Sequence, residues 1–171
     1  MNTREKVLTT IDANRNKTME LAHWIYENPE IALEEVKSCK YTAEFMREAG
    51  FDVTLDVVGM PNSFKAVKKN GDGPRIAFLA EYDALPEVGH ACGHHLIDAM
   101  SCAAGVGLAE ALKEYEGEVA VFGTPAEETG DGKAFMTEHG AFDGYDAALE
   151  VHPGNTTIIF PNEIAITGYD Y

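Results

Sequence analysis

Hydrophobic residues recur at helical spacing early in the chain and form short apolar runs further on. Leu8, Ile11, Ala22 and Ile25 fall near one face of the stretch 3–27, which predicts a single amphipathic helix. The same reasoning predicts further helices at 33–49, from the end of the loop at 89–98 to about residue 115, and at 133–138, and strands at 52–57, 63–68, 75–79, 118–123 and 147–151.

The alternation of strands with helices predicts an α/β fold with a mixed, mainly parallel sheet and helices on both faces. The Asn-Gly-Asp-Gly sequence at 70–73 predicts the turn between the second and third strands. A chain of 171 residues is long enough for one domain with its own core. The helix that ends near residue 115 is expected to bury one apolar stripe: Ile97, Met100, Ala104, Leu108 and Leu112.

Composition excludes some partners. Lys and Arg total 13 against 29 Asp and Glu, and the formal net charge of −16 argues against nucleic acid or an anionic membrane as a partner. No apolar run approaches the ~20 residues of a membrane span, so we expect no membrane-spanning segment. The three cysteines are few, odd in number and widely spaced, which favours free thiols and the cytoplasm over a disulfide framework.

Residues that can bind metals or transfer protons follow three of the predicted strands. They lie in the segments 81–83, 125–128 and 152–153. Because sites in open α/β sheets gather beyond the carboxyl ends of the strands, we expect these segments to share one cleft.

The loop at 89–98 carries one thiol and three imidazoles within six positions. A thiolate and a neutral imidazole are strong ligands for a borderline-soft divalent metal. Gly93 separates Cys92 from His94 and permits a tight turn, so the two side chains can converge on one ion.

Together these segments predict a metal site. Cys92, His94, Glu128 and His152 offer ligand types that suit Zn²⁺, with Mn²⁺ or Co²⁺ as alternatives. Neighbouring side chains of an extended segment point opposite ways, so Glu128 is expected to bind metal while Glu127 faces a substrate water as general base. The other histidines are not needed as ligands and are expected at the surface or behind the site: His23, His90, His95 and His139.

Each of these residues also has a simpler interpretation. The acidic doublet can be a solvated surface pair, His152 an ordinary strand-end histidine and Asp83 a turn or helix-capping residue. Cys92 can be a small buried apolar residue, or a nucleophile paired with a histidine. A thiol-based enzyme or redox sensor is therefore an alternative, although it leaves the doublet without a role.

The motifs at 81–86 (EYDALP), 89–94 (GHACGH) and 125–128 (PAEE), with Asn-Pro-Glu at 28–30, resemble the amidohydrolase branch of the aminoacylase/glutamate-carboxypeptidase metallopeptidases. The first motif and the His-Pro pair at 152–153 look most like the aminobenzoyl-glutamate hydrolase and the Xaa-Arg or β-alanyl-lysine dipeptidase type. The resemblance implies metal-dependent hydrolysis of an amide bond in N-acyl or N-aroyl amino acids, such as p-aminobenzoyl-glutamate, or in dipeptides.

The resemblance also implies a role for each matching residue. Glu127 would be the general base, and Asp83 would orient the site. Cys92 stands where relatives in the wider family have an aspartate that bridges two metals, and Glu81 replaces a histidine found in other branches. The implied cofactors are two divalent ions, with Zn²⁺ favoured, and their ligands are Cys92, His94, Glu128 and His152.

Members of this family are considerably longer than 171 residues. The resemblance assigns 1–163 to the N-terminal part of the catalytic domain and 164–171 to the start of a segment leading to a lid or dimerisation domain. It implies a small amide or dipeptide substrate, and either a homodimer or a complementing C-terminal half as partner. The alternative is a truncated, inactive metal-binding fragment. Because an incomplete sheet exposes apolar surface, we expect the isolated chain to associate or to be poorly soluble.

Overall fold

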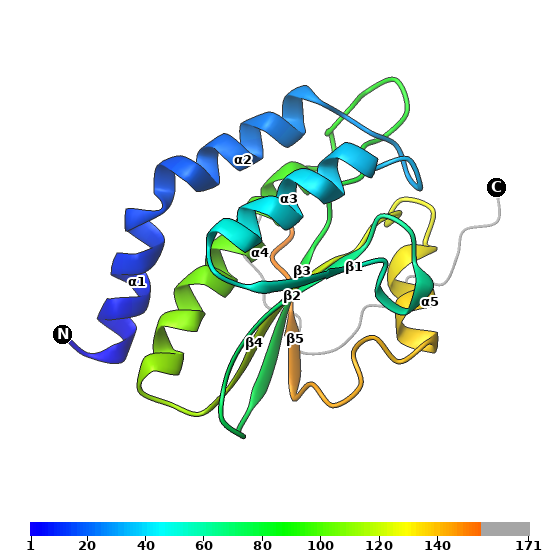
Figure 1. The fold of residues 1–171 in the computed structure, drawn as a ribbon. Coiled ribbons are helices and arrows are strands. Elements are labelled where there is room, and N and C mark those ends of the chain that lie inside the picture. The colour runs from blue at the N-terminus through cyan, green and yellow to red at the C-terminus, as the bar shows by residue number, and fades with distance from the viewer. Residues whose placement is uncertain (155–171) are drawn as a thin grey trace.

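The computed structural model of the chain describes residues 1–154, and its centre is a five-stranded sheet (Figure 1). The predicted boundary at 163 and the segment 164–171 lie outside the described residues. In chain order the elements are α1 (Thr3–Ala13), α2 (Arg15–Glu27), α3 (Val36–Glu48), β1 (Asp52–Leu55), the 3₁₀ turn η1 (Val57–Gly59), β2 (Phe64–Asn70), β3 (Arg75–Ala80), α4 (His94–Ala109), the 3₁₀ turn η2 (Glu110–Lys113), β4 (Gly117–Gly123), α5 (Gly132–Glu138) and β5 (Ala147–Leu149).

The strand order in the sheet is β1-β2-β4-β3-β5. β3 runs parallel to both β4 and β5, whereas β2 runs antiparallel to β1 and β4. Four strands therefore point the same way and only β2 opposes them, which confirms the predicted mixed, mainly parallel sheet. The turn at 70–73 joins β2 to β3, which are not neighbours because β4 lies between them.

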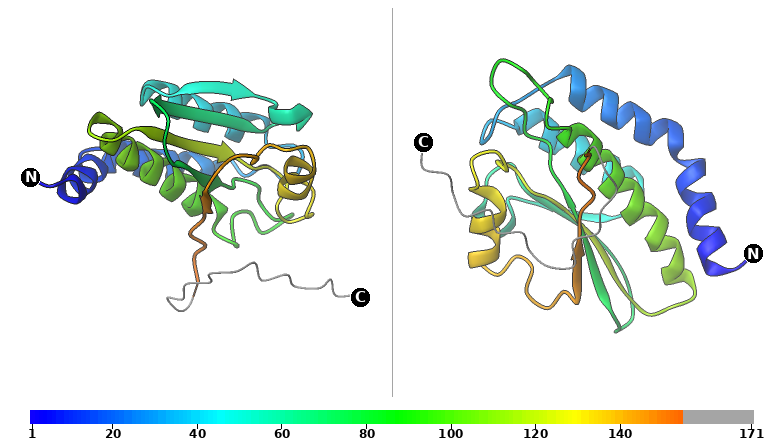
Figure 2. Two further views of the ribbon diagram at one scale, coloured as in Figure 1. Left: turned by 90° about the horizontal axis from the view of Figure 1, so that it is seen from below. Right: turned by 180° about the vertical axis from the view of Figure 1, so that it is seen from behind.

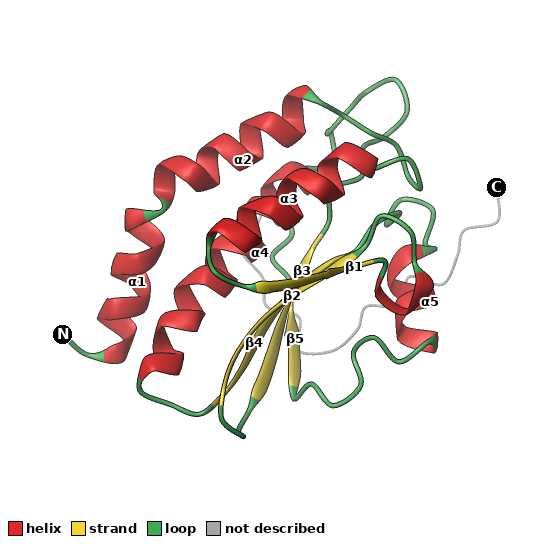
Figure 3. Cartoon of the chain, in the orientation of Figure 1, coloured by secondary structure: helices red, strands yellow, loops and turns green. Residues whose placement is uncertain are grey.

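Alternate side chains of β4 face two separate cores. Val119 and Val121 join a cluster that includes Met46 of α3, whereas Phe122 belongs to a second cluster with Met136 of α5. This alternation is what a strand buried on both faces requires. Figures 1 and 2 show α5 across the strands from the other four helices, and the cartoon in Figure 3 separates the layers by colour. The prediction of helices on both faces is confirmed.

The single helix predicted over 3–27 is wrong, because the chain forms two helices with a break at Asn14. The Asn14 side chain donates to the Thr10 carbonyl at 2.9 Å. α1 packs against α4 and η2, and no residue of α1 is fully buried; Leu8 is 46% exposed. The break lets α2 turn toward α3 and α4, where Ala22 and Ile25 are buried as predicted.

α4 buries small residues rather than the predicted stripe. Of that stripe only Ile97 is fully buried, and Met100 is 36% exposed. A Cβ added at Gly105 would lie 2.3 Å from Val121 Cγ2, so the glycine sets the close approach of α4 to the sheet. The segment His94–Lys113 is also long and apolar enough to cross a membrane by length and composition alone, contrary to the sequence expectation. In this fold it packs against β3, β4, α1 and α2 as a core helix.

A carboxyl group lies buried between α3 and α4. Asp98 is completely buried, and its Oδ2 accepts a hydrogen bond from Thr42 Oγ1 at 2.9 Å. Burial raises the pKa of Asp98 to about 8, and the hydrogen bond from Thr42 only partly offsets this effect.

We therefore expect the protein to lose stability as the pH rises from about 4 to about 8. In the unfolded chain Asp98 releases its proton near its ordinary pKa, whereas in the folded chain it keeps the proton until pH reaches about 8. The loss is on the order of a few kcal/mol. Asp98→Asn cannot ionise and should remove it, as measured by denaturant unfolding across this pH range. Asp72→Asn, at a fully exposed carboxylate paired with Lys69, should keep the wild-type slope; an unchanged slope in D98N would contradict the prediction.

Candidate metal centre

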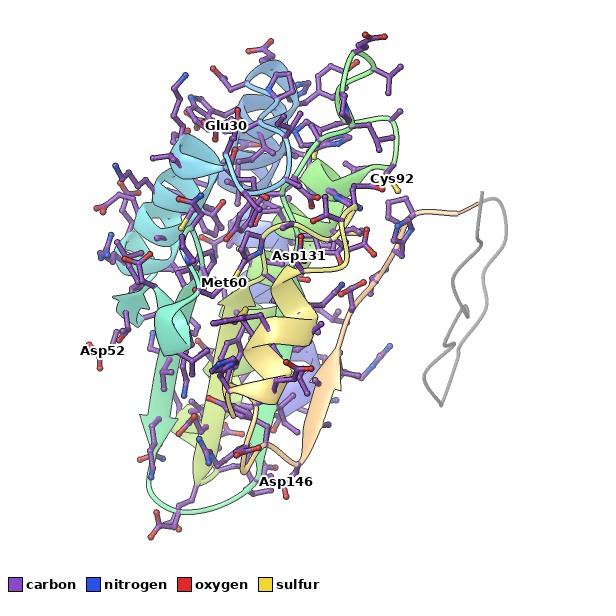
Figure 4. All side chains as sticks on the ribbon, turned by 90° about the vertical axis from the view of Figure 1, so that its right-hand side faces the viewer. Glu30, Asp52, Met60, Cys92, Asp131 and Asp146 are labelled. Carbon is purple, nitrogen blue, oxygen red and sulfur yellow. The ribbon has the colours of Figure 1, made fainter. Side chains whose placement is uncertain are left out.

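The segments that follow β3, β4 and β5 meet the amino end of α4 at one end of the sheet. In Figure 4, Glu30 and Cys92 lie at the upper end of the molecule and Asp146, which precedes β5, lies at the lower end. Cys92 Sγ is 3.6 Å from His152 Nε2, although 60 residues separate them. The parallel arrangement of β3, β4 and β5 explains the convergence, because their carboxyl ends lie on the same side.

His94 is at the centre of this convergence and is completely buried. Its Nδ1 lies 2.9 Å from both the backbone oxygen and Oδ1 of Asp83. Its Nε2 has no hydrogen-bond partner within residues 1–154. Oxygens of three carboxylates surround Nε2: Glu81 at 3.4 Å, and Glu127 and Glu128 each at 3.6 Å.

Two groups of side chains in the described part of the chain could hold a metal ion, and His94 belongs to both. The first contains Cys92, His94 and His152, and the second contains Glu81, His94 and Glu127. Within each group the ligand atoms lie within 4.8 Å of one another. The structure thus brings Cys92, His94 and His152 together. Glu128 approaches His94 but belongs to neither group.

The acidic doublet does not separate as the sequence argument expected. Glu127 and Glu128 both reach the same nitrogen of His94 instead of pointing opposite ways. The reason is local backbone geometry: the segment is a turn, in which Ala126 has φ of +56° and Gly130 N–H donates to the Glu127 carbonyl at 2.8 Å. Glu127 keeps 37% of its side chain exposed and can therefore meet solvent or substrate.

Sequence reasoning missed Glu81 as a site residue. Glu81 is 1% exposed and forms an ion pair with Lys133 of α5, which also lies 3.1 Å from Glu150. Its position at the end of β3, two residues before Asp83, was the available signal. Lys133 carried no such signal, because only the packing of α5 brings it to the site.

The histidines that were not assigned as ligands differ in their surroundings. His90 is 6% exposed, and neither of its ring nitrogens has a partner in the described residues. Burial, together with the neighbouring His95, lowers the pKa of His90 to about 4. The two rings lie 5.3 Å apart, so these residues support the loop from behind. His23 and His139 are exposed, as expected for surface histidines.

The electrostatics at His94 favour charge separation between acid and base. Burial raises the pKa of Asp83, but the hydrogen bonds from His94 and from the Glu128 backbone N–H outweigh it and leave the pKa below its usual value. Burial lowers the pKa of His94, but Asp83 and the nearby carboxylates outweigh it and raise the pKa overall. Burial raises the pKa of Glu127, with an opposing effect from His94.

Cys92 is poorly suited to act as a free thiolate nucleophile. Burial and the neighbouring carboxylates, Glu128 foremost, raise the pKa of its thiol to about 11. Reactive cysteines have a lowered pKa, usually beside positive charge. A cation bound at this position would instead displace the thiol proton, as metal binding to cysteine does generally.

Comparison with known proteins bears on what this site is. The sequence model of peptidase family M20/M25/M40 matches residues 77–167, which include the segments after β3, β4 and β5. The chain belongs to this family. Membership confirms the resemblance that the motifs at 81–86, 89–94 and 125–128 indicated.

Individual relatives of the M20 chain agree with this assignment. It is 38% identical over 162 residues to one of the subunits of the p-aminobenzoyl-glutamate hydrolase of Escherichia coli (strain K12), a match that covers 84% of this chain and 34% of that protein. It is 34% identical over 175 residues to the Xaa-Arg dipeptidase of Mus musculus, covering 95% and 41%. The chain therefore spans well under half the length of these curated relatives.

A solved structure supports the fold. The YXEP protein of Bacillus subtilis, described as a dinuclear metal binding peptidase of the M20 family, superposes with a TM-score of 0.71 at 26% identity. The match covers 80% of this chain and 42% of that one. The α/β architecture found here is thus that of an M20 peptidase.

Proposed function

We propose that this chain provides the metal-binding part of an amidohydrolase that cleaves an amide bond in N-acyl or N-aroyl amino acids or in dipeptides. The observation that carries the proposal is the geometry at His94. Its Nε2 is buried, lacks a partner in the described residues and faces carboxylates, while Cys92 and His152 lie beside it. The names of the two relatives, a p-aminobenzoyl-glutamate hydrolase and an Xaa-Arg dipeptidase, support the substrate class.

The residues present fit two divalent cations. Asp83 engages Nδ1 of His94 and leaves Nε2 to face the site, the arrangement by which carboxylates orient histidine ligands in metal sites. Cys92, His94, Glu128 and His152 would be the ligands, and Glu81 is a further candidate. The mixed thiolate, imidazole and carboxylate set favours Zn²⁺, with Mn²⁺ or Co²⁺ as alternatives.

Glu127 is the general base in this proposal. The chemistry supplied by bound divalent cations is polarisation of the scissile carbonyl and activation of the attacking water. Glu127 lies within 3.6 Å of His94 and is partly exposed, so its carboxylate can accept the proton of that water. It can then donate the proton to the departing amine. Asp83 holds His94 by its Nδ1 throughout.

Metal content and inhibition test the proposal. We expect the purified full-length protein to carry bound divalent metal and to hydrolyse p-aminobenzoyl-glutamate, N-acyl amino acids or dipeptides. Chelation should abolish the activity, and Zn²⁺ or Mn²⁺ added back should restore it. Hydrolysis that survives complete chelation but is blocked by alkylation of Cys92 would support the thiol-enzyme alternative instead. A protein that binds metal but cleaves none of these substrates would support the inactive-fragment alternative.

The partner and compartment follow from the same fold. β5 pairs only with β3 in the described residues, and Leu149 and Val151 are 49% and 60% exposed beside it. We propose that further polypeptide, from the same protein, a second copy or a complementing chain, covers this edge. None of the three cysteines forms a disulfide, which supports the cytoplasm as the compartment.

A further inference from the structure

Glu35 lies in the segment between α2 and α3, far in sequence from the metal-binding residues. It immediately precedes α3 and is completely buried. Its Oε1 accepts a hydrogen bond from the backbone N–H of Ala126 at 2.7 Å, across 91 residues of chain. Its Oε2 has no hydrogen-bond partner in residues 1–154. Because burial of a carboxyl group is costly, its single contact with Ala126 calls for an explanation.

Ala126 is the residue at which the chain turns into the acidic doublet. Its φ of +56° lies in the left-handed region, which alanine rarely adopts, and its side chain is completely buried. The Ala126 carbonyl accepts from Asp131 N–H at 3.2 Å and closes the turn. The bond from Glu35 therefore fixes the amide of an unfavourable conformation directly before Glu127.

A second carboxylate holds the chain on the other side of Glu127. The backbone N–H of Glu128 donates to Asp83 Oδ2 at 3.0 Å. The backbone before and after Glu127 is thus tied to two buried carboxylates from different parts of the chain, Glu35 and Asp83. Asp83 also engages His94, whereas the hydrogen bonds of the Glu35 carboxylate reach the site only through the turn.

The segment that carries Glu35 is itself anchored. The Glu30 carboxylate accepts from the backbone N–H groups of Lys37 and Ser38, at 2.9 and 2.8 Å, and so fixes the start of α3. The Glu30 carbonyl accepts from Ala84 N–H at 2.8 Å. Segment 28–35 therefore contacts both the residue after Asp83 and the residue before Glu127, and Figure 4 shows Glu30 at the same end of the molecule as Cys92.

We propose that Glu35 is a positioning residue that holds the Ala126 turn, and through it the carboxylates of Glu127 and Glu128, in the arrangement required to bind divalent cations and to move a proton. The inference rests on the proposed function and assigns a role to the region of the Asn-Pro-Glu motif, which the proposed metal site leaves without one. Glu35 touches neither ligand nor substrate and acts only by accepting the Ala126 N–H.

A pair of substitutions in the full-length protein tests this role. Glu35→Gln keeps an acceptor oxygen at nearly the same place, and Glu35→Met fills a similar volume without one. We expect E35M to lower Zn²⁺ or Mn²⁺ affinity about 10- to 100-fold, the usual effect of removing a group that supports metal ligands. E35Q should stay near wild type. In metal-free protein, hydrogen exchange at the Ala126 amide should be faster in E35M but not in E35Q.

Ser63→Ala is the matched control, because Ser63 is also fully buried and accepts a backbone N–H, that of Val57, at 2.8 Å. It should lower the melting temperature without lowering metal affinity. Equal loss of metal affinity in E35Q and E35M, or unchanged Ala126 exchange or metal affinity in E35M, would overturn the proposal. The exchange measurement needs neither metal nor turnover, so it separates failure of this role from failure of the proposed function.

Discussion

Glu127→Gln should reduce hydrolysis by about 10²- to 10⁴-fold, which is the usual contribution of a general base. Glutamine keeps the shape of the side chain but cannot accept the proton of the attacking water. Glu127 is the site carboxylate with the greatest exposure, so it is the one best placed to meet a substrate water. Turnover would be measured with saturating metal in the full-length protein, and bound metal would be measured in parallel.

The metal content separates the two roles that the doublet can play. In Glu127→Gln the bound metal should stay at the wild-type level, whereas in Glu128→Gln it should fall. Glu138→Gln, at an exposed position of α5, should change neither quantity. If E127Q lost its metal and E128Q kept it, the assignment of base and ligand would have to be exchanged. The nearly equal distances of the two carboxylates from His94 make this comparison necessary.

His94→Asn should have the larger effect on metal binding. His94 is the one residue shared by both groups of candidate ligands in the described chain, so its removal disables both. Loss of a group behind a ligand already costs about 10- to 100-fold in affinity, and loss of this central ligand should cost more than about 100-fold. Competition of the protein with a chelating dye for Zn²⁺ would measure the change.

A matched histidine controls for general effects of the substitution. His139→Asn replaces an exposed histidine after α5, and its metal affinity should equal that of wild type. The melting temperature of metal-free H94N shows whether the variant folds. A folded H94N that binds Zn²⁺ as tightly as H139N would refute the central place of His94 in the site.

The sequence by itself determined the order of the elements and the residue types of the site. Short apolar runs located all five strands, because a strand buried on both faces must be continuously apolar, as β4 is. Placement of 81–83, 125–128 and 152–153 after strands was enough to predict one shared cleft, since the carboxyl ends of parallel strands meet. Helix periodicity was less informative for α4, whose closest contacts with the sheet use glycine and other small residues.

Only the tertiary structure decided which side chains share the site and how they are held. Lys133 and Glu35 come from α5 and from the start of α3, and local sequence contains no pattern that brings them to His94 or to Ala126. The left-handed turn at Ala126 directs both glutamates to one nitrogen, which the assumption of an extended segment could not reveal. Ligand type is a local chemical property of each residue, whereas distances between residues so far apart in the chain depend on how the helices pack against the sheet.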